Sequence, residues 1–439
     1  MKKSILFTLF LLSALPVMAG NQTDSSNVKV LATGMNVIAD GQTLAVQPLE
    51  VFPQTDEAVL VAGKPNWQGP VYLSNVAWRY RAMTKGSLKV RLDGKPLKEG
   101  TDYLIDYEWG TVGSPSNGIA IGKKVGLEFT YTQTRLDLAV RNQSGEVEIV
   151  KGEPAMATPM LPQAPEGTIP LFSIYLPHNT TALSEKNINI MDSTSISFGP
   201  AVGTEFLKAK LDQLKSGHSF TIVFFGDSIT AWQTTPPGKE FVARFADWIQ
   251  GKYPDRKIIC QRLDPAKNED AMIPVKPAKN EIAIVMAGLG GDTSSMGLKR
   301  MEKHVLIHHP DLVFIMFGVN DDNRYGNVPY VSPDQYEKNL IMMVKKIREK
   351  GGEPVIMTTS MKNPSWSSGI LPELARRARR VAEKNKVCLI DHYKAWEALP
   401  KHGYHYMILL DSCINHPNSM GHEMFFNGIE MALQKSLEP

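Results

Sequence analysis

The stretch Phe220-Thr221-Ile222-Val223-Phe224-Phe225-Gly226-Asp227-Ser228 decides the fold of the larger part of this chain. Six consecutive apolar or β-branched residues predict a strand that is buried on both faces, which is typical of a parallel sheet. The Gly-Asp-Ser that follows places a serine between this strand and a helix. In such sheets, functional side chains gather beyond the carboxyl ends of the strands.

Strands and helices alternate along the rest of this region. Short apolar runs predict four further strands, and helical patterns lie between them. The predicted strands are 282–286, 312–317, 354–358 and 387–390, and the predicted helices are 204–215, 240–252, 335–350, 374–386 and 418–435. This alternation predicts an α/β domain over residues 196–439, with a parallel sheet covered by helices on both faces.

Residues 20–195 follow a different pattern. Short alternating segments, such as 87–92 and 125–131, are separated by turn sequences such as Asp93-Gly94-Lys95-Pro96. Strands at this spacing predict a β-rich, sandwich-like accessory domain. Five prolines in the segment 154–170 indicate an extended segment or a linker. A chain of 439 residues fits two domains, and we place their boundary near residue 195.

The first 19 residues have the pattern of a secretory signal peptide. Lys2 and Lys3 precede an apolar run from Ile5 to Leu15, and small residues up to Ala19 mark a cleavage site. The run is too short to cross a bilayer comfortably as a helix, and an uncleaved anchor is the alternative. We therefore expect an exported protein, periplasmic or extracellular, with no membrane span after removal of the signal.

Charge and cysteine content argue against several classes of function. The chain has 48 Lys and Arg against 45 Asp and Glu, so nothing suggests a nucleic-acid or membrane-surface partner. The chain has three cysteines, Cys260, Cys388 and Cys413, and their spacing matches neither a disulfide framework nor a zinc site. A single disulfide between two of them is an open alternative. We expect no metal and no organic cofactor.

Three loops that follow predicted strands carry candidate catalytic residues. Ser228 presents a hydroxyl at the sheet edge, and its own N–H can point at a developing oxyanion; a helix-capping serine is the alternative. The loop 288–293, Gly-Leu-Gly-Gly-Asp-Thr, lets backbone approach a substrate, or is a simple tight turn. Asn320 can aim its side-chain amide at the same oxygen, or form an Asx-turn. Asp321 and Asp322 suggest a metal site more weakly, because no partner set accompanies them.

A histidine before the last predicted helix completes the candidate set. His416 lies in the segment 411–418, from which it can reach the serine as a general base. The other histidines have structural explanations. We expect His304, His308 and His309 on or just after a helix as solvated or capping groups, and His422 within the last helix.

Taken in order, four blocks resemble the SGNH (GDSL-type) hydrolase family over about 240 residues. The blocks are Gly226-Asp227-Ser228, Gly290-Gly291-Asp292-Thr293, Gly318-x-Asn320-Asp321 and His416-Pro417-Asn418. The resemblance implies a flavodoxin-like three-layer α/β/α fold, with Ser228 as the nucleophile and His416 as the base. It also implies an oxyanion hole made by the N–H groups of Ser228 and Gly291 and by the Asn320 amide.

One position departs from the family pattern. The usual third catalytic residue is an Asp three residues before the His, where this chain has Cys413. Asp411, five residues before His416, is our preferred orienter of the imidazole through a longer loop. The alternatives are a Ser–His dyad whose ring is held by another group, such as a backbone carbonyl, and Asp391 at the end of the fifth strand.

The predicted reaction is hydrolysis of an acyl ester through an acyl-enzyme, by a carboxylic ester hydrolase. Export, the β-rich domain and the polysaccharide deacetylases of the family that it resembles favour an acetylated carbohydrate as the substrate. Tryptophans can stack on sugar rings or simply fill a core. The candidates are Trp67, Trp78, Trp109, Trp366 and, best placed, Trp232.

Other functions remain open from the sequence. An O-acyltransferase, or a lipase or lysophospholipase, would use the same scaffold. A non-catalytic binding protein with a degenerate hydrolase domain would explain the departure at Cys413. The physiological substrate, the role of the β-rich domain and the oligomeric state do not follow from the sequence.

Overall fold

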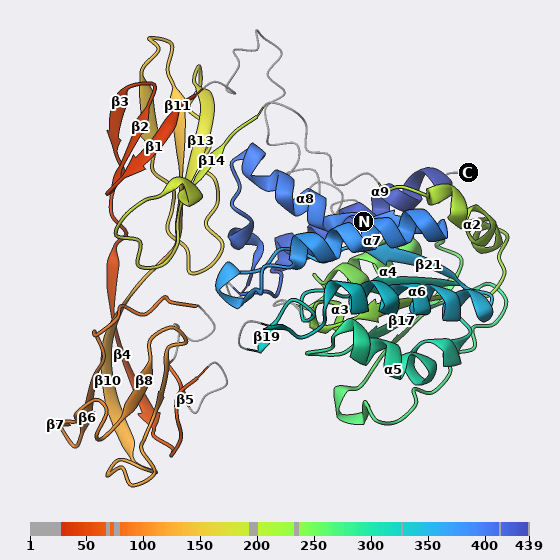
Figure 1. Cartoon of the computed structure of the whole chain (residues 1–439), viewed down its shortest axis with the longest axis horizontal. Helices are drawn as coiled ribbons and strands as arrows, with labels where there is room; N and C mark the ends of the chain where they lie inside the picture. The colour runs from red at the N-terminus through yellow and green to blue at the C-terminus, as the bar shows by residue number, and fades with distance from the viewer. Residues whose placement is uncertain are drawn as a thin grey trace.

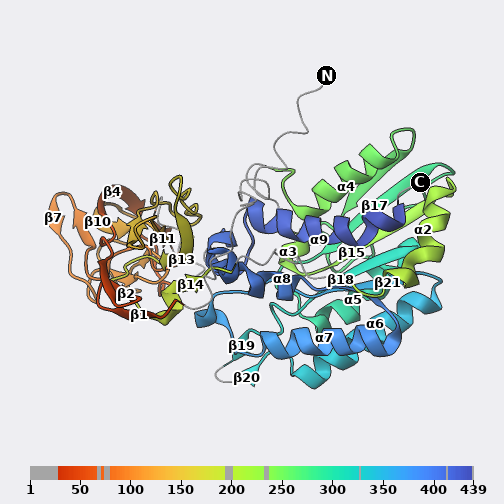
Figure 2. The ribbon, with the colours of Figure 1, turned by 90° about the horizontal axis from the view of Figure 1, so that it is seen from above.

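The computed structural model describes residues 28–66, 71–73, 80–192, 201–231, 237–325, 328–411 and 414–437. An α/β domain lies beside two β lobes (Figures 1 and 2). The predicted signal peptide, the predicted boundary near residue 195 and Cys413 lie outside the described residues, as do Trp67, Trp78 and Trp232. In the part of the chain that is described, none of the helices has the length and apolar character that a membrane crossing requires.

A six-stranded parallel sheet forms the centre of the α/β domain. In spatial order its strands are β16 (Lys257–Arg262), β17 (Glu281–Gly288), β15 (Phe220–Gly226), β18 (Leu312–Met316), β21 (Glu353–Met357) and β22 (Cys388–Ile390). After β15, the chain builds the sheet first on one side and then on the other. β15 therefore lies where the strand order reverses, which is where ligands bind in sheets of this kind.

Helices cover both faces of this sheet, as predicted (Figure 2). One face carries α2 (Lys208–Lys215), α4 (Phe241–Lys252) and α9 (Ser419–Leu437), and the other carries α5 (Ser294–His304), α6 (Pro333–Glu349) and α7 (Leu371–Asn385). A single turn, α3 (Ser228–Ala231), follows β15, and α8 (His392–Ala398) follows β22. Short 3₁₀ turns complete the domain: η3 (Thr204–Leu207), η4 (Pro265–Lys267), η5 (Leu306–His308), η6 (Pro364–Trp366), η7 (Leu399–His402) and η8 (Tyr406–Leu409).

Alternating side chains of β15 explain why the sheet is buried on both faces. Ile222 and Phe224 belong to the core that includes α4 and α9, and Val223 and Phe225 belong to the core that includes α5 and α6. The Phe224 ring packs edge-on against Phe245 of α4, with the ring centroids 5.0 Å apart. The three-layer α/β/α prediction is thus confirmed.

The sequence analysis missed β16, the two-stranded hairpin of β19 (Arg324–Tyr325) and β20 (Val328–Pro329), and the short helix α8, and it misjudged two histidines. β16 is an edge strand of half-buried and exposed residues, so it has no continuous apolar run. The prediction that His304 and His308 are solvated or capping groups is wrong, because both are buried. His304 Nε2 lies 2.9 Å from the Asp270 carbonyl, and His308 Nδ1 accepts the Val275 N–H at 3.1 Å. The segment 270–275 therefore folds over these rings.

The N-terminal region forms two antiparallel lobes instead of one sandwich (Figure 1). Each lobe has its own apolar core. The first lobe contains β1 (Val30–Thr33), β2 (Asn36–Ala39), β3 (Gln42–Ala45), β11 (Arg135–Arg141), β12 (Val147–Val150), β13 (Ile169–Leu176) and β14 (Ile188–Ile190), with η2 (Glu185–Asn187). The second contains β4 (Val51–Val59), β5 (Val71–Tyr72), β6 (Lys89–Leu92), β7 (Lys95–Pro96), β8 (Leu104–Asp106), β9 (Thr111–Gly113) and β10 (Lys124–Thr132). The Pro-rich segment connects β12 to β13 of one sheet, so it is an extended loop within a lobe.

Both lobes contact the α/β domain through specific groups. In the first lobe, the Ser173 hydroxyl donates to the Gly403 carbonyl at 2.6 Å, and the Tyr175 ring stacks on His405 with 4.5 Å between centroids. In the second lobe, Trp109 packs edge-on against Trp366 of η6 at 5.0 Å. The lobes therefore pack against segments 399–410 and 364–366, which belong to loops beyond the carboxyl ends of the sheet.

Candidate active site

The register of three neighbouring strands brings the candidate loops together. Gly226 at the end of β15 lies beside Gly288 of β17 on one side and Met316 of β18 on the other. The segments that follow these residues carry Ser228, the glycine-rich loop and Asn320. These loops therefore leave the sheet side by side.

Two glycines allow the turn that carries Ser228 to pack closely against the neighbouring strands. A Cβ on Gly226 would come within 2.6 Å of the Met316 carbonyl oxygen. A Cβ on Gly288 would come within 2.5 Å of the Ala231 nitrogen in α3. Real Cβ atoms do not approach backbone atoms this closely. The position of Ser228 therefore depends on glycine at residues 226 and 288.

The structure brings Ser228 and His416 into hydrogen-bonding contact. His416 Nε2 lies 2.9 Å from Ser228 Oγ, although the two residues are 188 positions apart. The imidazole is carried by a loop closed at its base by an antiparallel bridge between Leu410 and Pro417. A nucleophile and a base in this contact are the pair that acyl transfer requires.

The environment of His416 keeps its imidazole neutral. Burial of the ring lowers the pKa of His416 to about 4. A neutral ring nitrogen accepts a proton, whereas a protonated ring does not. At neutral pH the ring is therefore in the state that a general base needs.

Asp411 lies opposite His416 in the same loop. Its N–H donates to the His416 carbonyl at 2.8 Å, and the Asn418 N–H donates to Leu409 at 2.8 Å. In this antiparallel register, residues 411 and 416 are direct partners, and such partners project their side chains to the same face. Asp391, the other candidate, accepts hydrogen bonds from Arg379 at 2.6 Å and from the Thr358 hydroxyl at 3.0 Å, and it caps α8.

Asn320 is held between the glycine-rich loop and Asn323. Its side-chain nitrogen donates to the Asp292 carbonyl at 2.9 Å, and its oxygen accepts from Asn323 at 3.2 Å. An amide nitrogen carries two hydrogens, and the bond to Asp292 uses one of them. Gly291 occupies the exposed turn of the neighbouring loop with a φ of +80°, a conformation that favours glycine.

Sequence reasoning missed the group that supports these loops from beneath. Arg300 of α5 forms an ion pair with Asp292 and donates to the Gly226 carbonyl at 2.9 Å. It therefore ties the glycine-rich loop to the end of the serine strand. The residue was missed because arginines are rarely buried, and its partner Gly226 lies 74 residues away in the sequence.

The carboxyl groups near this site have protein partners. Asp227 is buried, burial raises its pKa to about 8, and its Oδ1 accepts the Ile229 N–H at 2.9 Å. Asp321 accepts from the Ser294 N–H and hydroxyl. Asp322 pairs with the buried Lys362 at 3.0 Å. Across the described ranges, no group of three or more His, Cys, Asp and Glu side chains is arranged to hold a metal ion.

Two candidate sugar-stacking residues, the buried Trp109 and the partly buried Trp366, pack against each other. Trp109 is 8% exposed, and its ring lies between Tyr80 and Trp366. Their role is to join the second lobe to the α/β domain. Cys260 and Cys388 are free thiols.

The fold and this geometry are those of an α/β hydrolase with a candidate Ser–His pair. A serine on a strand-to-helix turn contacts a histidine from a C-terminal loop, beside a glycine-rich turn and an asparagine amide. The family model of the GDSL-like lipase/acylhydrolase family matches residues 224–424, so this part of the chain is a domain of that family. The resemblance of the four sequence blocks is thereby confirmed.

Several known proteins are similar to this domain. "Uncharacterized lipoprotein YqeF" of Bacillus subtilis is 28% identical over 138 residues, which is 31% of this chain and 47% of the relative. An acetylxylan esterase of Geobacillus stearothermophilus is 23% identical over 231 residues, covering 48% of this chain and 91% of that enzyme. A solved lipase/acylhydrolase from Enterococcus faecalis has 25% identity and a TM-score of 0.38, covering 50% of this chain and 98% of that one. The family match makes the C-terminal region a GDSL-like lipase/acylhydrolase domain, and one of these relatives is an esterase.

Proposed function

We propose that this protein is an exported serine esterase that removes acyl groups, acetyl groups in particular, from a carbohydrate. The observation that carries the proposal is the 2.9 Å contact between Ser228 Oγ and His416 Nε2 at the carboxyl edge of the sheet. The neutral imidazole and the adjacent Gly291 and Asn320 supply the other requirements of ester cleavage.

In this mechanism, Ser228 Oγ attacks the ester carbonyl carbon while His416 Nε2 takes the hydroxyl proton. The N–H groups of Ser228 and Gly291 and the Asn320 amide stabilise the tetrahedral oxyanion, and one such donor contributes about 2.7–4 kcal/mol. His416 then protonates the departing alcohol as its bond to the carbonyl carbon breaks. Water attacks the acyl-enzyme, gives its proton to His416, and releases the acid as Ser228 regains a proton.

Asp411 is our candidate for the group that orients the imidazole. Its place opposite His416 in the closed loop supports this role, because paired residues share a face. A carboxylate there would hold the ring and stabilise the imidazolium that forms in each step.

Two observations support a carbohydrate ester as the substrate. One relative, which this chain covers over 91% of its length, is an acetylxylan esterase. The first 19 residues have the signal-peptide pattern, which would bring the enzyme to extracellular polysaccharides. Transfer of the acyl group to a sugar hydroxyl uses the same acyl-enzyme, so the products must be identified.

The test is turnover of a short-chain aryl acetate and of a panel of acetylated polysaccharides. We expect Ser228→Ala to lower kcat by at least about 10⁴-fold with an unchanged unfolding temperature, because the nucleophile is lost and the fold is not. Mass spectrometry of the products separates free acetate from acetate moved to another sugar. The proposal fails if the variant keeps its activity, or if the folded wild-type protein cleaves none of these esters.

A further inference from the structure

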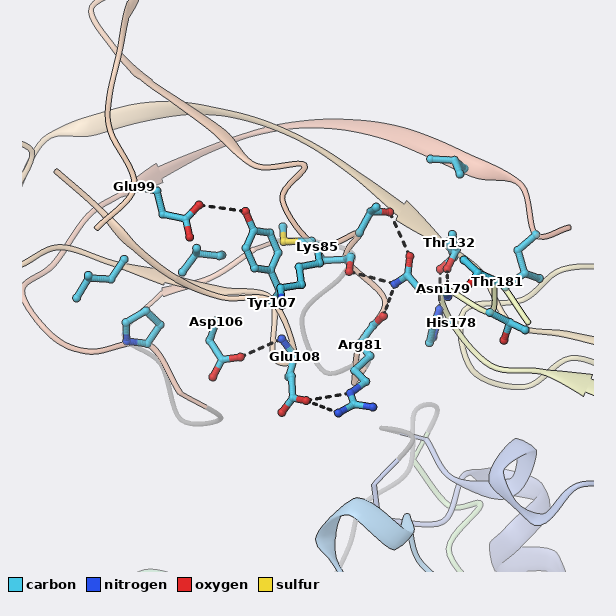
Figure 3. A pocket seen from close by; sticks show the side chains of 18 of the residues that line it. Arg81, Lys85, Glu99, Asp106, Tyr107, Glu108, Thr132, His178, Asn179 and Thr181 are labelled. Atoms are coloured by element: carbon cyan, nitrogen blue, oxygen red, sulfur yellow. Dashed lines mark hydrogen bonds and ion pairs between the residues drawn. The ribbon is translucent and has the colours of Figure 1, made fainter. Parts of the chain in front are cut away.

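A large groove lies on the β lobes, outside the catalytic residues (Figure 3). It has a volume of about 1520 Å³ and is lined by residues of both lobes and of the segment after β13. Sites for a single small molecule are usually about 300–1,000 Å³. The size of this groove therefore favours an extended ligand.

Asn179 builds one wall of this groove. Its side-chain nitrogen lies within hydrogen-bonding distance of the carbonyls of Arg81, Ala82 and Met83, at 2.6, 3.2 and 3.1 Å. Its oxygen accepts the Thr84 hydroxyl at 3.2 Å (Figure 3). One side chain thus fixes the path of residues 81–84 along the groove.

The rim of the groove holds an arginine in an uncommon conformation. Arg81 has a φ of +62°, a backbone region that long side chains rarely adopt. Its guanidinium pairs with Glu108, with 3.0 Å between Nε and Oε1, and lies over the Tyr80 ring at 5.0 Å. Both members of the ion pair are about half exposed. Backbone strain that the surroundings hold in place is a feature of ligand-binding sites.

The lining has a balanced charge and an amphipathic character. Among the described residues it contains three cations, Lys64, Arg81 and Lys85, and three anions, Glu99, Asp106 and Glu108. Equal numbers of positive and negative side chains do not favour a polyanionic ligand. A ligand with a long alkyl chain is disfavoured because its binding would remove water from these charges. The half-buried Tyr107 ring, whose hydroxyl donates to Glu99 at 3.4 Å, adds an apolar face. Hydrogen-bonding groups beside such a face suit a neutral ligand with many hydroxyls.

The groove rim is connected to the catalytic loop. Glu108 precedes Trp109, whose ring packs on Trp366 in η6. In the same segment, the Asn363 N–H donates to the Ile414 carbonyl at 2.7 Å, two residues before His416. The groove rim is therefore linked to the candidate active site through direct contacts between neighbouring segments.

We propose that this groove binds a neutral oligosaccharide segment of the substrate, away from the ester that is cleaved. The proposal rests on the proposed function and specifies its substrate: an uncharged polysaccharide chain. Tyr107 would contact sugar rings, and Arg81 and Glu108 would hydrogen-bond to hydroxyls.

Binding to the full chain carrying Ser228→Ala tests this proposal. Calorimetry would use unacetylated xylan, glucan and mannan oligosaccharides of several units, with oligogalacturonate and a fatty acid as the polyanion and lipid probes. We expect saturable binding of a neutral oligosaccharide, weakened at least about tenfold by Tyr107→Ala or Glu108→Gln, which corresponds to the loss of about 1.4 kcal/mol. In the active enzyme, these changes should lower the ratio of kcat/KM on acetylated polymer to kcat/KM on aryl acetate.

Glu57→Gln is the matched control. Glu57 is an exposed glutamate of the same lobe, is ion-paired to Lys124 and lies outside the groove lining, so its loss should leave oligosaccharide binding unchanged. Unfolding temperatures would show that the variants are folded.

The proposal is overturned if no neutral oligosaccharide binds, if only the polyanion or the fatty acid binds, or if Glu57→Gln weakens binding as much as Glu108→Gln. Failures of the two proposals are distinguishable. Unaltered binding in the groove variants, with esterase activity lost in Ser228→Ala, refutes the groove alone. Groove-dependent binding with no ester cleavage by the wild-type protein refutes the esterase alone.

Discussion

Lys362 supports the loop that carries Asn320. Its side chain is 1% exposed, pairs with Asp322 at 3.0 Å, and donates to Val319 and Asn323 at 2.9 and 2.8 Å. Asn323 in turn donates to Asn320. A buried ion pair is tolerated when its remaining hydrogen bonds are made, and here Ser367, Ser368 and Ile370 satisfy the Asp322 carboxylate. Lys362 is therefore a positioning residue for Asn320.

Replacing Lys362 tests this positioning role. We expect Lys362→Met, made together with Asp322→Asn so that no charge stays buried alone, to lower kcat about 10–100-fold with little change in KM. If the effect passes through Asn320, it should be smaller in an Asn320→Ala background, because coupled residues are not additive. An equal loss of kcat in both backgrounds would contradict the role.

The pH dependence of activity should reflect the burial of His416. The imidazole must be neutral to accept the Ser228 proton, and burial lowers its pKa to about 4. We expect kcat/KM on an aryl acetate to stay level from neutral pH down to about 5, and to fall only as the pH passes through about 4. An acidic limb centred at the ordinary histidine value of about 6.5 would contradict this environment.

At the scale of elements, the turn from β15 into α3 depends on the end of β17. A Cβ at Gly288 would lie 2.5 Å from the Ala231 nitrogen and 2.9 Å from the Asp227 carbonyl oxygen. These are backbone atoms, so they cannot rotate away, and α3 would have to move with Ser228. Displacement of a reacting group by about 1 Å can cost about 10²-fold in rate.

We therefore expect Gly288→Ala to lower kcat by about 10²-fold, measured beside its unfolding temperature. Gly290→Ala is the control in the same loop, because no atom lies within 4 Å of the Cβ it would add and its φ is not positive. Equal activities of the two variants would show that the close packing of β17 on α3 does not set the position of the serine.

Across the whole molecule, buried histidines should make the fold sensitive to acid. Burial lowers seven histidine pKa values below the ordinary value of about 6.5. The pKa falls to about 4 for His308, His405 and His416, to about 3 for His392 and His422, and below its usual range for His304 and His402. Each ring gains a proton on unfolding below pH 6.5, so its stabilising contribution is present above that pH and is lost as the pH falls toward 4. Four carboxyls act in the opposite direction, because burial raises the pKa of Asp227 to about 8, that of Asp321 to about 6, and those of Asp292 and Glu397 above their usual range.

The histidines outnumber the raised carboxyls seven to four, so the unfolded state binds more protons than the folded state between about pH 6 and 4. We therefore expect the free energy of unfolding to fall as the pH is lowered through this range, by about 1.4 kcal/mol per pH unit for each net proton. Urea unfolding at a series of pH values measures this slope. A free energy that stays constant or rises toward pH 4.5 would contradict it.

The elements that the sequence predicted are those whose burial pattern is local. Five strands are continuous apolar runs, so consecutive residues are enough to indicate their burial. They are β15, β17, β18, β21 and β22. The sequence analysis expected a helix near His304 but gave no bounds for α5, because its core face includes Arg300 and His304, polar residues whose burial depends on partners elsewhere in the chain. Lys362 was not predicted for the same reason, because its burial also depends on partners elsewhere in the chain. The run of polar residues that follows β21 at the sheet edge could have indicated that functional residues lie there.

The sequence by itself determined the layers of the α/β domain and singled out Ser228, Gly291, Asn320 and His416, because strand ends and ordered motifs are local features. Only the tertiary structure decided that residues 228 and 416 meet at 2.9 Å. It also decided that the N-terminal region divides into two lobes and that a groove forms across them. These features depend on contacts between distant segments, whose geometry follows from the packing of the whole chain and not from any local pattern.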